Sequence, residues 1–225
     1  NEHGMVEHIV RHIPVFPGRC EVIFVEGHST DGTLQEIQRF AEEKYEHFTI
    51  RYAIQDGIGK ADAVWKGFRM AQHEVLMILD ADLTVAPEEL KRFYDAIVTH
   101  PDALINGSRL VYPIECGAMR RFNYVGNILF AFLLSFLCGQ WLSDTLCGTK
   151  VLTKRNFERI ANLPFFKTVN DPFGDFSLLL GAATLGMSII EMPIHYRRRV
   201  YGSTKIRRFR DGWKLLKIAV SYVFS

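Results

Sequence analysis

The chain has 225 residues, of which 48% are hydrophobic and 23% are charged, and this length and composition are typical of one globular domain with a sizeable core. The formal net charge is only +2, which gives no global reason to expect a nucleic acid as a partner. The four cysteines lack the close spacing of a zinc site or a disulfide framework, so we expect reduced thiols and a cytoplasmic location.

Strand-like and helix-like segments alternate in the first half of the chain. The predicted strands are short β-branched or apolar runs, at Glu21–Glu26, Phe48–Ala53, Glu74–Leu79 and from Ala103. The predicted helices have apolar residues at helical spacing, around Leu34–Phe40, over Lys60–Met70 and from Pro87 to about His100. This alternation favours a parallel sheet covered by helices on both faces, and the continuously apolar run Glu74–Leu79 is predicted as a central strand.

The second half of the chain is less regular. Phe122–Leu142 carries no charge and is about long enough to span a bilayer, but several polar residues and glycines interrupt it. A buried or membrane-surface helix is therefore favoured over a membrane span. The segment Cys147–Leu152 follows this helix, a further strand is predicted at Ser188–Ile194, and further helices are predicted near Lys154–Asn162 and over about Asp175–Leu185.

A basic segment follows these elements. Between Arg197 and Lys217 nine basic residues accompany a single acid, Asp211. Such clustering indicates phosphate or an anionic membrane surface as a partner, and the alternative interpretation is a solvated charged face.

Two acids, Asp80 and Asp82, directly follow the predicted strand Glu74–Leu79. In open α/β sheets, ligands bind in the crevice outside the carboxyl ends of the strands. A turn at this point lets both carboxylates reach one divalent ion, and hard oxygen ligands suit Mg²⁺ or Mn²⁺, which can bridge a diphosphate. The alternative is a solvated acidic loop without a metal.

Two weaker motifs precede this pair of acids. Glu26 ends a predicted strand where it could accept hydrogen bonds from a base or a ribose, although a turn and helix cap that includes Asp31 is the commoner explanation. A glycine-rich turn at Asp56–Gly59 leads into a helix that begins with Lys60, and the N-terminus of such a helix favours phosphate. The turn lacks the spacing of a Walker loop or a dinucleotide fingerprint.

Taken together and in this order, the motifs resemble those of family 2 glycosyltransferases of the GT-A fold, closest to the dolichyl-phosphate mannose synthase type. The matching stretches cover nearly the whole chain. They are Asn1-Glu2, VEGHSTDGT at 25–33, GIGKADAVWKGF at 57–68, LDADL at 79–83, NGSRL at 106–110, DTLCGTKVL at 144–152, GDFSLLL at 174–180 and EMPIHYRRRVYGSTK at 191–205.

The resemblance implies a Rossmann-like α/β fold with a mixed, mostly parallel sheet between helices, whose first strand would precede Asn1. It also implies one catalytic domain over residues 1–225, with a nucleotide-sugar-binding half at 1–110 and an acceptor-side half at 111–225.

Roles for single residues follow from the matched positions. Glu26 would contact the nucleotide base, and Asp80 and Asp82 would hold the ribose, the diphosphate and a Mg²⁺ or Mn²⁺ ion. The other candidates are Glu2, Asp31 and Lys60 for the donor, Arg109, Arg199 and Lys205 for phosphate of donor or acceptor, and Asp175 as a general base near the acceptor. Glu26-Gly27 stands where many relatives have two aspartates, which leaves recognition of the base open.

The reaction implied by the resemblance is an inverting transfer of a sugar from a GDP- or UDP-linked donor. The acceptor would be a polyprenyl phosphate or a glycan, reached by peripheral association with the cytoplasmic face of a membrane. Two alternatives remain open at this stage, a sugar-1-phosphate nucleotidyltransferase and a non-catalytic module that binds nucleotide or membrane.

Overall fold

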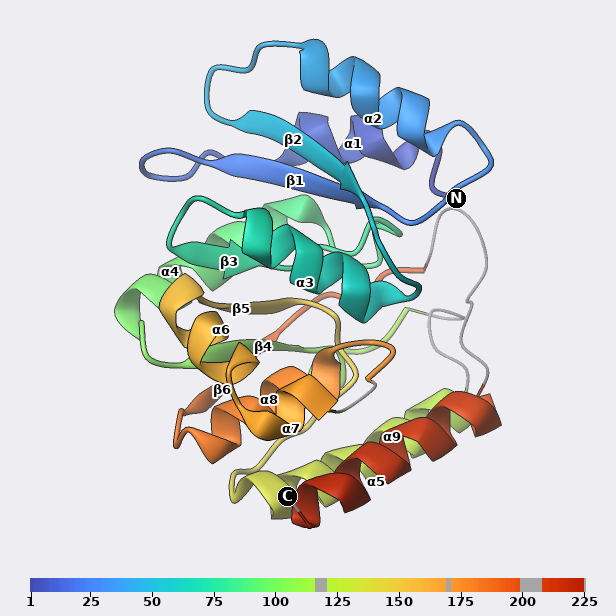
Figure 1. Ribbon diagram of the computed structural model, residues 1–225, viewed down its shortest axis with the longest axis vertical. Coiled ribbons are helices and arrows are strands. Elements are labelled where there is room, and N and C mark those ends of the chain that lie inside the picture. The colour runs from blue at the N-terminus through green and yellow to red at the C-terminus, as the bar shows by residue number, and fades with distance from the viewer. Residues whose placement is uncertain (116–120, 169–170, 199–207, 225) are drawn as a thin grey trace.

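The computed structural model describes residues 1–115, 121–168, 171–198 and 208–224. Helices cover two β-sheets, and in the view of Figure 1 the two-stranded sheet lies above the four-stranded one. In chain order the elements are α1 (Met5–His12), β1 (Glu21–Glu26), α2 (Thr33–Glu42), β2 (Thr49–Ile54), α3 (Lys60–Met70), β3 (Val75–Met77), the 3₁₀ turn η1 (Pro87–Glu89), α4 (Leu90–Thr99), β4 (Leu104–Ser108), α5 (Arg121–Cys138), β5 (Lys150–Thr153), α6 (Lys154–Ala161), α7 (Pro164–Thr168), α8 (Asp175–Thr184), β6 (Ile189–Pro193) and α9 (Arg208–Val223).

The strands combine parallel and antiparallel pairing. β1 pairs in parallel with β2, and the second sheet has the order β3-β5-β4-β6. β4 and β6 are parallel, whereas β5 runs antiparallel to both of its neighbours, β3 and β4. The predicted α/β fold with a mixed sheet between helices is confirmed. The antiparallel strand β5 comes from the less regular second half of the chain, and it starts at the edge where β3 and β4 end.

β3 differs from its prediction in length and position. It is shorter than Glu74–Leu79, and it forms an edge of the four-stranded sheet in the described parts of the chain, so the predicted central position is wrong there. Its apolar character has another cause, since both faces of the strand are covered. Leu76 packs into one core cluster, and Val75 and Met77 pack against another.

The two-residue periodicity of the strands divides the core of this sheet into two layers. In β4, Leu104 belongs to the cluster shared with α6 and α8, whereas Ile105 belongs to the cluster shared with α4. In β5, Leu152 and Val151 divide in the same way. All four side chains are fully buried, so the sheet is a rigid support for the loops at its edge.

Helices α5 and α9 pack side by side at one end of the molecule (Figure 1). One stripe of α5, which includes Asn127, Ala131 and Leu134, is buried. The opposite stripe is apolar yet exposed, and together with α9 it forms what we term the α5–α9 face. Its large exposed side chains are Phe122, Val125, Leu129, Phe132 and Phe136 of α5 and Trp213, Val220 and Val223 of α9. In the described part of the chain, no helix has both the length and the apolar character needed to cross a bilayer.

Candidate active site

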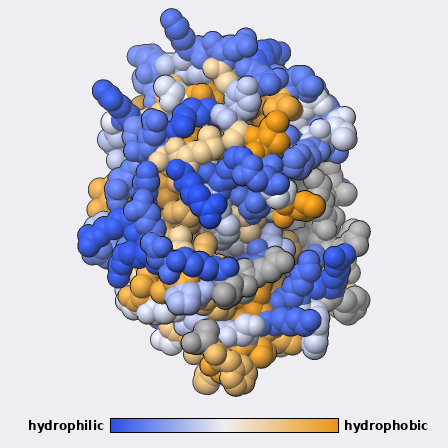
Figure 2. Space-filling view, in the orientation of Figure 1, coloured by the Kyte–Doolittle hydropathy of each residue, from blue (hydrophilic) through white to orange (hydrophobic). Residues whose placement is uncertain are grey.

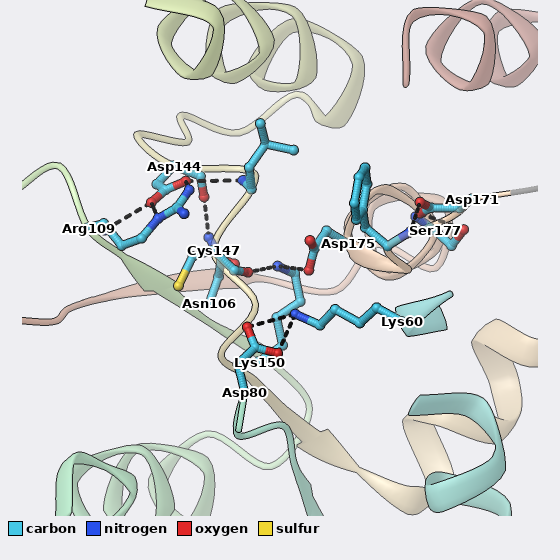
Figure 3. Close-up of polar contacts among 12 residues, drawn as sticks. Lys60, Asp80, Asn106, Arg109, Asp144, Cys147, Lys150, Asp171, Asp175 and Ser177 are labelled. Carbon is cyan, nitrogen blue, oxygen red and sulfur yellow. Dashed lines mark hydrogen bonds and ion pairs between the residues drawn. The ribbon is translucent and has the colours of Figure 1, made fainter. Parts of the chain in front are cut away.

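Asp80 lies beyond the carboxyl end of β3 and forms an ion pair with Lys60, the first residue of α3 (Figure 3). The Lys60 ammonium is 2.7 Å from Oδ1 and 2.9 Å from Oδ2 of Asp80. Burial alone would raise the pKa of the Asp80 carboxyl, but the adjacent Lys60 holds it below its ordinary value. Burial alone would lower the pKa of Lys60, but Asp80 and then Asp175 raise it. Both groups are therefore charged at neutral pH.

Asp82 lies in a tight loop after Asp80. Its Oδ1 accepts hydrogen bonds from the backbone N–H of Thr84 at 3.1 Å and from the Thr84 hydroxyl at 2.7 Å. Between them, Leu83 has a φ of 55°, a left-handed conformation that a bulky residue rarely adopts. The Thr84 carbonyl accepts a hydrogen bond from the N–H of Arg197 at 3.0 Å. Strain of this kind persists where the surrounding structure fixes it, so the loop holds Asp82 in one position.

The antiparallel direction of β5 adds a second ion pair to this edge of the sheet. Lys150 is the first residue of β5 and is completely buried. Its ammonium donates to Oδ1 of Asp175 at 3.0 Å and to the carbonyl of Cys147 (Figure 3). Asp175 begins α8 and is also buried. The structure thus brings the predicted base Asp175 close to Lys60 and Asp80, with Lys150 bound to its carboxylate.

Gly148 lies in the loop before β5, directly after Cys147. A Cβ atom at this position would be 2.1 Å from Oδ2 of Asp80 and 2.1 Å from Nζ of Lys60. Any other residue would therefore have to displace both charged groups. Gly148 lets the backbone pass this close to the ion pair.

Arg109 follows β4 and forms a third ion pair, with Asp144. Its Nε donates to Oδ2 of Asp144 at 2.7 Å, and its second amino nitrogen donates to Oδ1 at 2.8 Å. Asp144 is completely buried, yet the pKa of its carboxyl lies below the ordinary value, because Arg109 outweighs the effect of burial. The guanidinium also lies over the ring of Tyr196, 5.2 Å from its centroid. The predicted phosphate ligand Arg109 is thus held by a carboxylate of its own chain.

Backbone hydrogen bonds fix the loop that carries Asp144. Glu191 in β6 accepts from the N–H groups of Ser143 at 2.8 Å and Asp144 at 3.1 Å. The side-chain amide of Asn106 in β4 donates to the carbonyl of Asp144 at 2.7 Å. The loop between Ser143 and Lys150 is therefore attached to both strands of the parallel pair, and it keeps Gly148 in place.

The remaining predicted donor residues lie at or against the loop that follows β1. Glu26 is buried, and its carboxylate accepts from the backbone N–H groups of His28 at 2.9 Å and Ser29 at 2.5 Å. Burial alone would raise the pKa of Glu26, but these hydrogen bonds lower it. Hydrogen bonds from Thr33 and His3 likewise lower the pKa of Asp31 to about 2 against the effect of burial. The backbone N–H of Glu2 donates to Thr33 at 2.9 Å. These contacts join the N-terminal segment to the loop after β1.

Comparisons with known proteins decide the family. Residues 4–161 match the family model described as Glycosyl transferase family 2. The chain belongs to glycosyl transferase family 2. It is 31% identical to the dolichyl-phosphate hexose transferase of Haloferax volcanii, over 87% of this chain and 77% of that protein. Glycosyltransferase AglJ of the same organism is 29% identical over 87% of this chain, which spans 60% of AglJ.

A solved structure supports the fold. The glucosyl-3-phosphoglycerate synthase of Mycobacterium tuberculosis, in complex with phosphoglyceric acid, superposes with a TM-score of 0.66 over 99% of this chain and 76% of the other. The sequence identity is 17%, so this likeness concerns the fold alone, and it agrees with the predicted GT-A architecture.

For a family 2 glycosyltransferase, the carboxylates of Asp80 and Asp82 fit a divalent ion in their chemistry. Both are hard oxygen ligands in one fixed loop at the end of a strand. The described residues contain no group of three or more histidine, cysteine, aspartate or glutamate side chains suited to a metal ion. An ion on Asp80 and Asp82 would therefore take further oxygen ligands from phosphate and water, as is usual for Mg²⁺.

Two predicted residues, Arg199 and Lys205, lie outside the described residues. Several residues that shape this site had no role predicted from the sequence, namely Asp144, Gly148, Lys150 and Glu191. Asp144, Gly148 and Lys150 all lie in the motif DTLCGTKVL, and Glu191 opens EMPIHY. The motifs mark these residues in the sequence, but they do not show which side chains the residues contact, because those side chains are distant in sequence.

Proposed function

We propose that this family 2 glycosyltransferase moves a hexose from a nucleoside-diphosphate sugar to a polyprenyl phosphate, with inversion, at the cytoplasmic surface of a membrane. The observation that carries the proposal is the Lys60–Asp80 pair at the carboxyl end of β3, next to the fixed loop of Asp82. This is the edge of an α/β sheet at which ligands bind.

The donor diphosphate would lie between Lys60 and the two aspartates. Lys60 lies at the N-terminus of α3, where the helix dipole and the ammonium both favour phosphate oxygens. Asp80 and Asp82 would hold Mg²⁺ or Mn²⁺, which when bound stabilises the negative charge of the departing nucleoside diphosphate. Arg109, held by Asp144, would add positive charge at the neighbouring strand end.

The state of Asp175 favours a phosphate acceptor. Its carboxylate already accepts a hydrogen bond from the buried Lys150, so it is poorly placed to remove a proton from a sugar hydroxyl. A lipid phosphate needs no base, because its oxygen is already a nucleophile. The name of the 31% identical relative, a dolichyl-phosphate hexose transferase, agrees in kind with such an acceptor.

The α5–α9 face supports association with a membrane surface. Phe122 and Phe136 at the two ends of the α5 stripe are 79% and 80% exposed, and such contiguous apolar surface is uncommon on a soluble monomer. Figure 2 shows hydrophobic side chains at the end of the molecule where α5 and α9 lie. Two exposed basic residues of α9, Arg210 and Lys217, accompany this face and suit anionic headgroups.

A transfer assay tests the proposal. Full-length protein is incubated with Mn²⁺, a polyprenyl phosphate in vesicles and a panel of GDP- and UDP-sugars, and the glycolipid product is measured. Asp82→Ala is expected to reduce turnover by at least about a hundredfold without unfolding the domain. The control Asp95→Ala, which removes an exposed partner of Lys91 on α4, should retain activity.

Unchanged turnover in Asp82→Ala would reject the proposed metal pair. No transfer from any donor to any lipid phosphate would reject the reaction. Flotation of the protein with the same vesicles checks the membrane part, which is contradicted if the protein remains in the heavy fraction.

A further inference from the structure

Lys60 occupies both oxygens of the first proposed metal ligand. Its ammonium lies 2.7 Å from Oδ1 and 2.9 Å from Oδ2 of Asp80, so both carboxylate oxygens already contact the lysine cation. A divalent ion that bound Asp80 in this state would share the carboxylate with an ammonium group. Two cations on one carboxylate repel each other strongly at such distances.

The pair lies against the loop before β5. The backbone of Gly148 lies so close to the pair that a Cβ there would be 2.1 Å from both charged groups. The other lysine nearby, Lys150, cannot take the place of Lys60, because it is fully buried and bonded to Asp175 and the Cys147 carbonyl. The pair Lys60–Asp80 is thus a defined arrangement within the site.

Lys60 can nevertheless leave Asp80 without a change of fold. Its side chain is 26% exposed, and it lies at the start of α3, where no helical turn precedes it. A lysine side chain rotates about four bonds, so its ammonium can reach a neighbouring anion while the backbone stays in place. A diphosphate bound at the N-terminus of α3 would be such an anion.

We infer that Lys60 acts as an internal counter-cation, which keeps a divalent ion from binding tightly to Asp80 until a diphosphate arrives and takes over the lysine. The inference rests on the proposed function and adds an order of binding to it. The ion and the nucleoside diphosphate load together, because the diphosphate supplies the negative charge that both cations need. In the absence of nucleotide the site prefers its own lysine.

Removing the lysine charge separates this role from ordinary phosphate binding. Lys60→Met is expected to bind Mn²⁺ alone at least about tenfold more tightly than the wild type, since the competing ammonium is gone. The same variant is expected to bind GDP or UDP at saturating Mn²⁺ at least about tenfold more weakly, because the phosphate loses its lysine. The two affinities therefore change in opposite directions.

The experiment measures free Mn²⁺ by electron paramagnetic resonance, with and without nucleoside diphosphate, on full-length protein. The matched control is Lys66→Met on the same helix, which breaks an exposed pair with Asp56 and should change neither affinity. Lys60→Gln repeats the measurement with a polar, uncharged side chain, and it decides the result if Lys60→Met does not fold.

If the folded Lys60 variant binds Mn²⁺ no more tightly than the wild type, the inference is wrong. The proposed function is unaffected by that result as long as the wild type binds nucleoside diphosphate in a metal-dependent way. If the wild type binds no nucleoside diphosphate with any divalent ion, the proposed donor site and the inference are both wrong.

Discussion

The ion pairs at the ends of β3 and β4 have the same charges and similar distances, but water reaches them differently. In Lys60–Asp80 the side chains are 26% and 34% exposed, whereas in Arg109–Asp144 they are 13% and 0% exposed. The first pair involves a lysine, which is a flexible point charge, and the second involves an arginine with two parallel hydrogen bonds.

This difference indicates different roles for two pairs at one edge of the sheet. A partly exposed pair can exchange one partner for a ligand, because solvent and phosphate can replace the lost contact. An enclosed, bidentate pair cannot be exchanged without leaving a charge unpaired in the interior. We therefore expect Lys60–Asp80 to function in binding, and Arg109–Asp144 to fix the loop that surrounds the site.

The largest expected effect is on stability. Asp144→Ala leaves the mostly buried guanidinium of Arg109 without its carboxylate and should lower the free energy of unfolding by about 3–5 kcal/mol. Urea denaturation followed by circular dichroism measures the change. Asp80→Ala is the control and should cost about 1 kcal/mol or less, since its pair is partly solvated. Equal losses in the two variants would remove the distinction between the pairs.

A smaller effect is expected from a substitution of Gly148, the loop residue that lies against the Lys60–Asp80 pair. Gly148→Ala would push against Asp80 and Lys60 and should slow sugar transfer by about ten- to a hundredfold, because displacement of a positioned group by about 1 Å is costly. Gly126→Ala on α5, where an added Cβ meets nothing within 4 Å, is the control for the transfer assay. A fully active Gly148→Ala would show that the position of the pair does not matter.

The smallest expected effect is a dependence on pH that distinguishes the enclosed pair. The pKa of Asp144 is lowered in the folded state, so its contribution to stability is fully present above the unfolded value of about 4 and is lost as the pH falls through the folded value. The difference in unfolding free energy between wild type and Asp144→Asn should shrink by about 1 kcal/mol between pH 7 and pH 3. A difference that grows toward acid would contradict this assignment.

Local sequence patterns predicted the elements that hold the site with little error. The strand Glu21–Glu26 and the helix Lys60–Met70 form over the predicted residues, because β-branched runs and helical spacing of apolar residues are local signals. The segment that begins at Cys147 carries no such clear local signal: β5 begins only at Lys150, and the preceding residues form the loop around the site. The apolar run before Asp80 indicated burial correctly, but it could not distinguish an edge strand from a central one.

The sequence by itself determined that two acids follow a buried strand, that a lysine begins the helix before it, and that these motifs resemble one family. Only the tertiary structure decided which charges meet. Arg109 and Asp144 are 35 positions apart, and Lys150 and Asp175 are 25 apart. Because β5 runs antiparallel to its neighbours, Gly148 and Lys150 lie at the same edge of the sheet as Asp80. No local pattern specifies this direction, because strand pairing is selected by burial of the whole sheet between its helices.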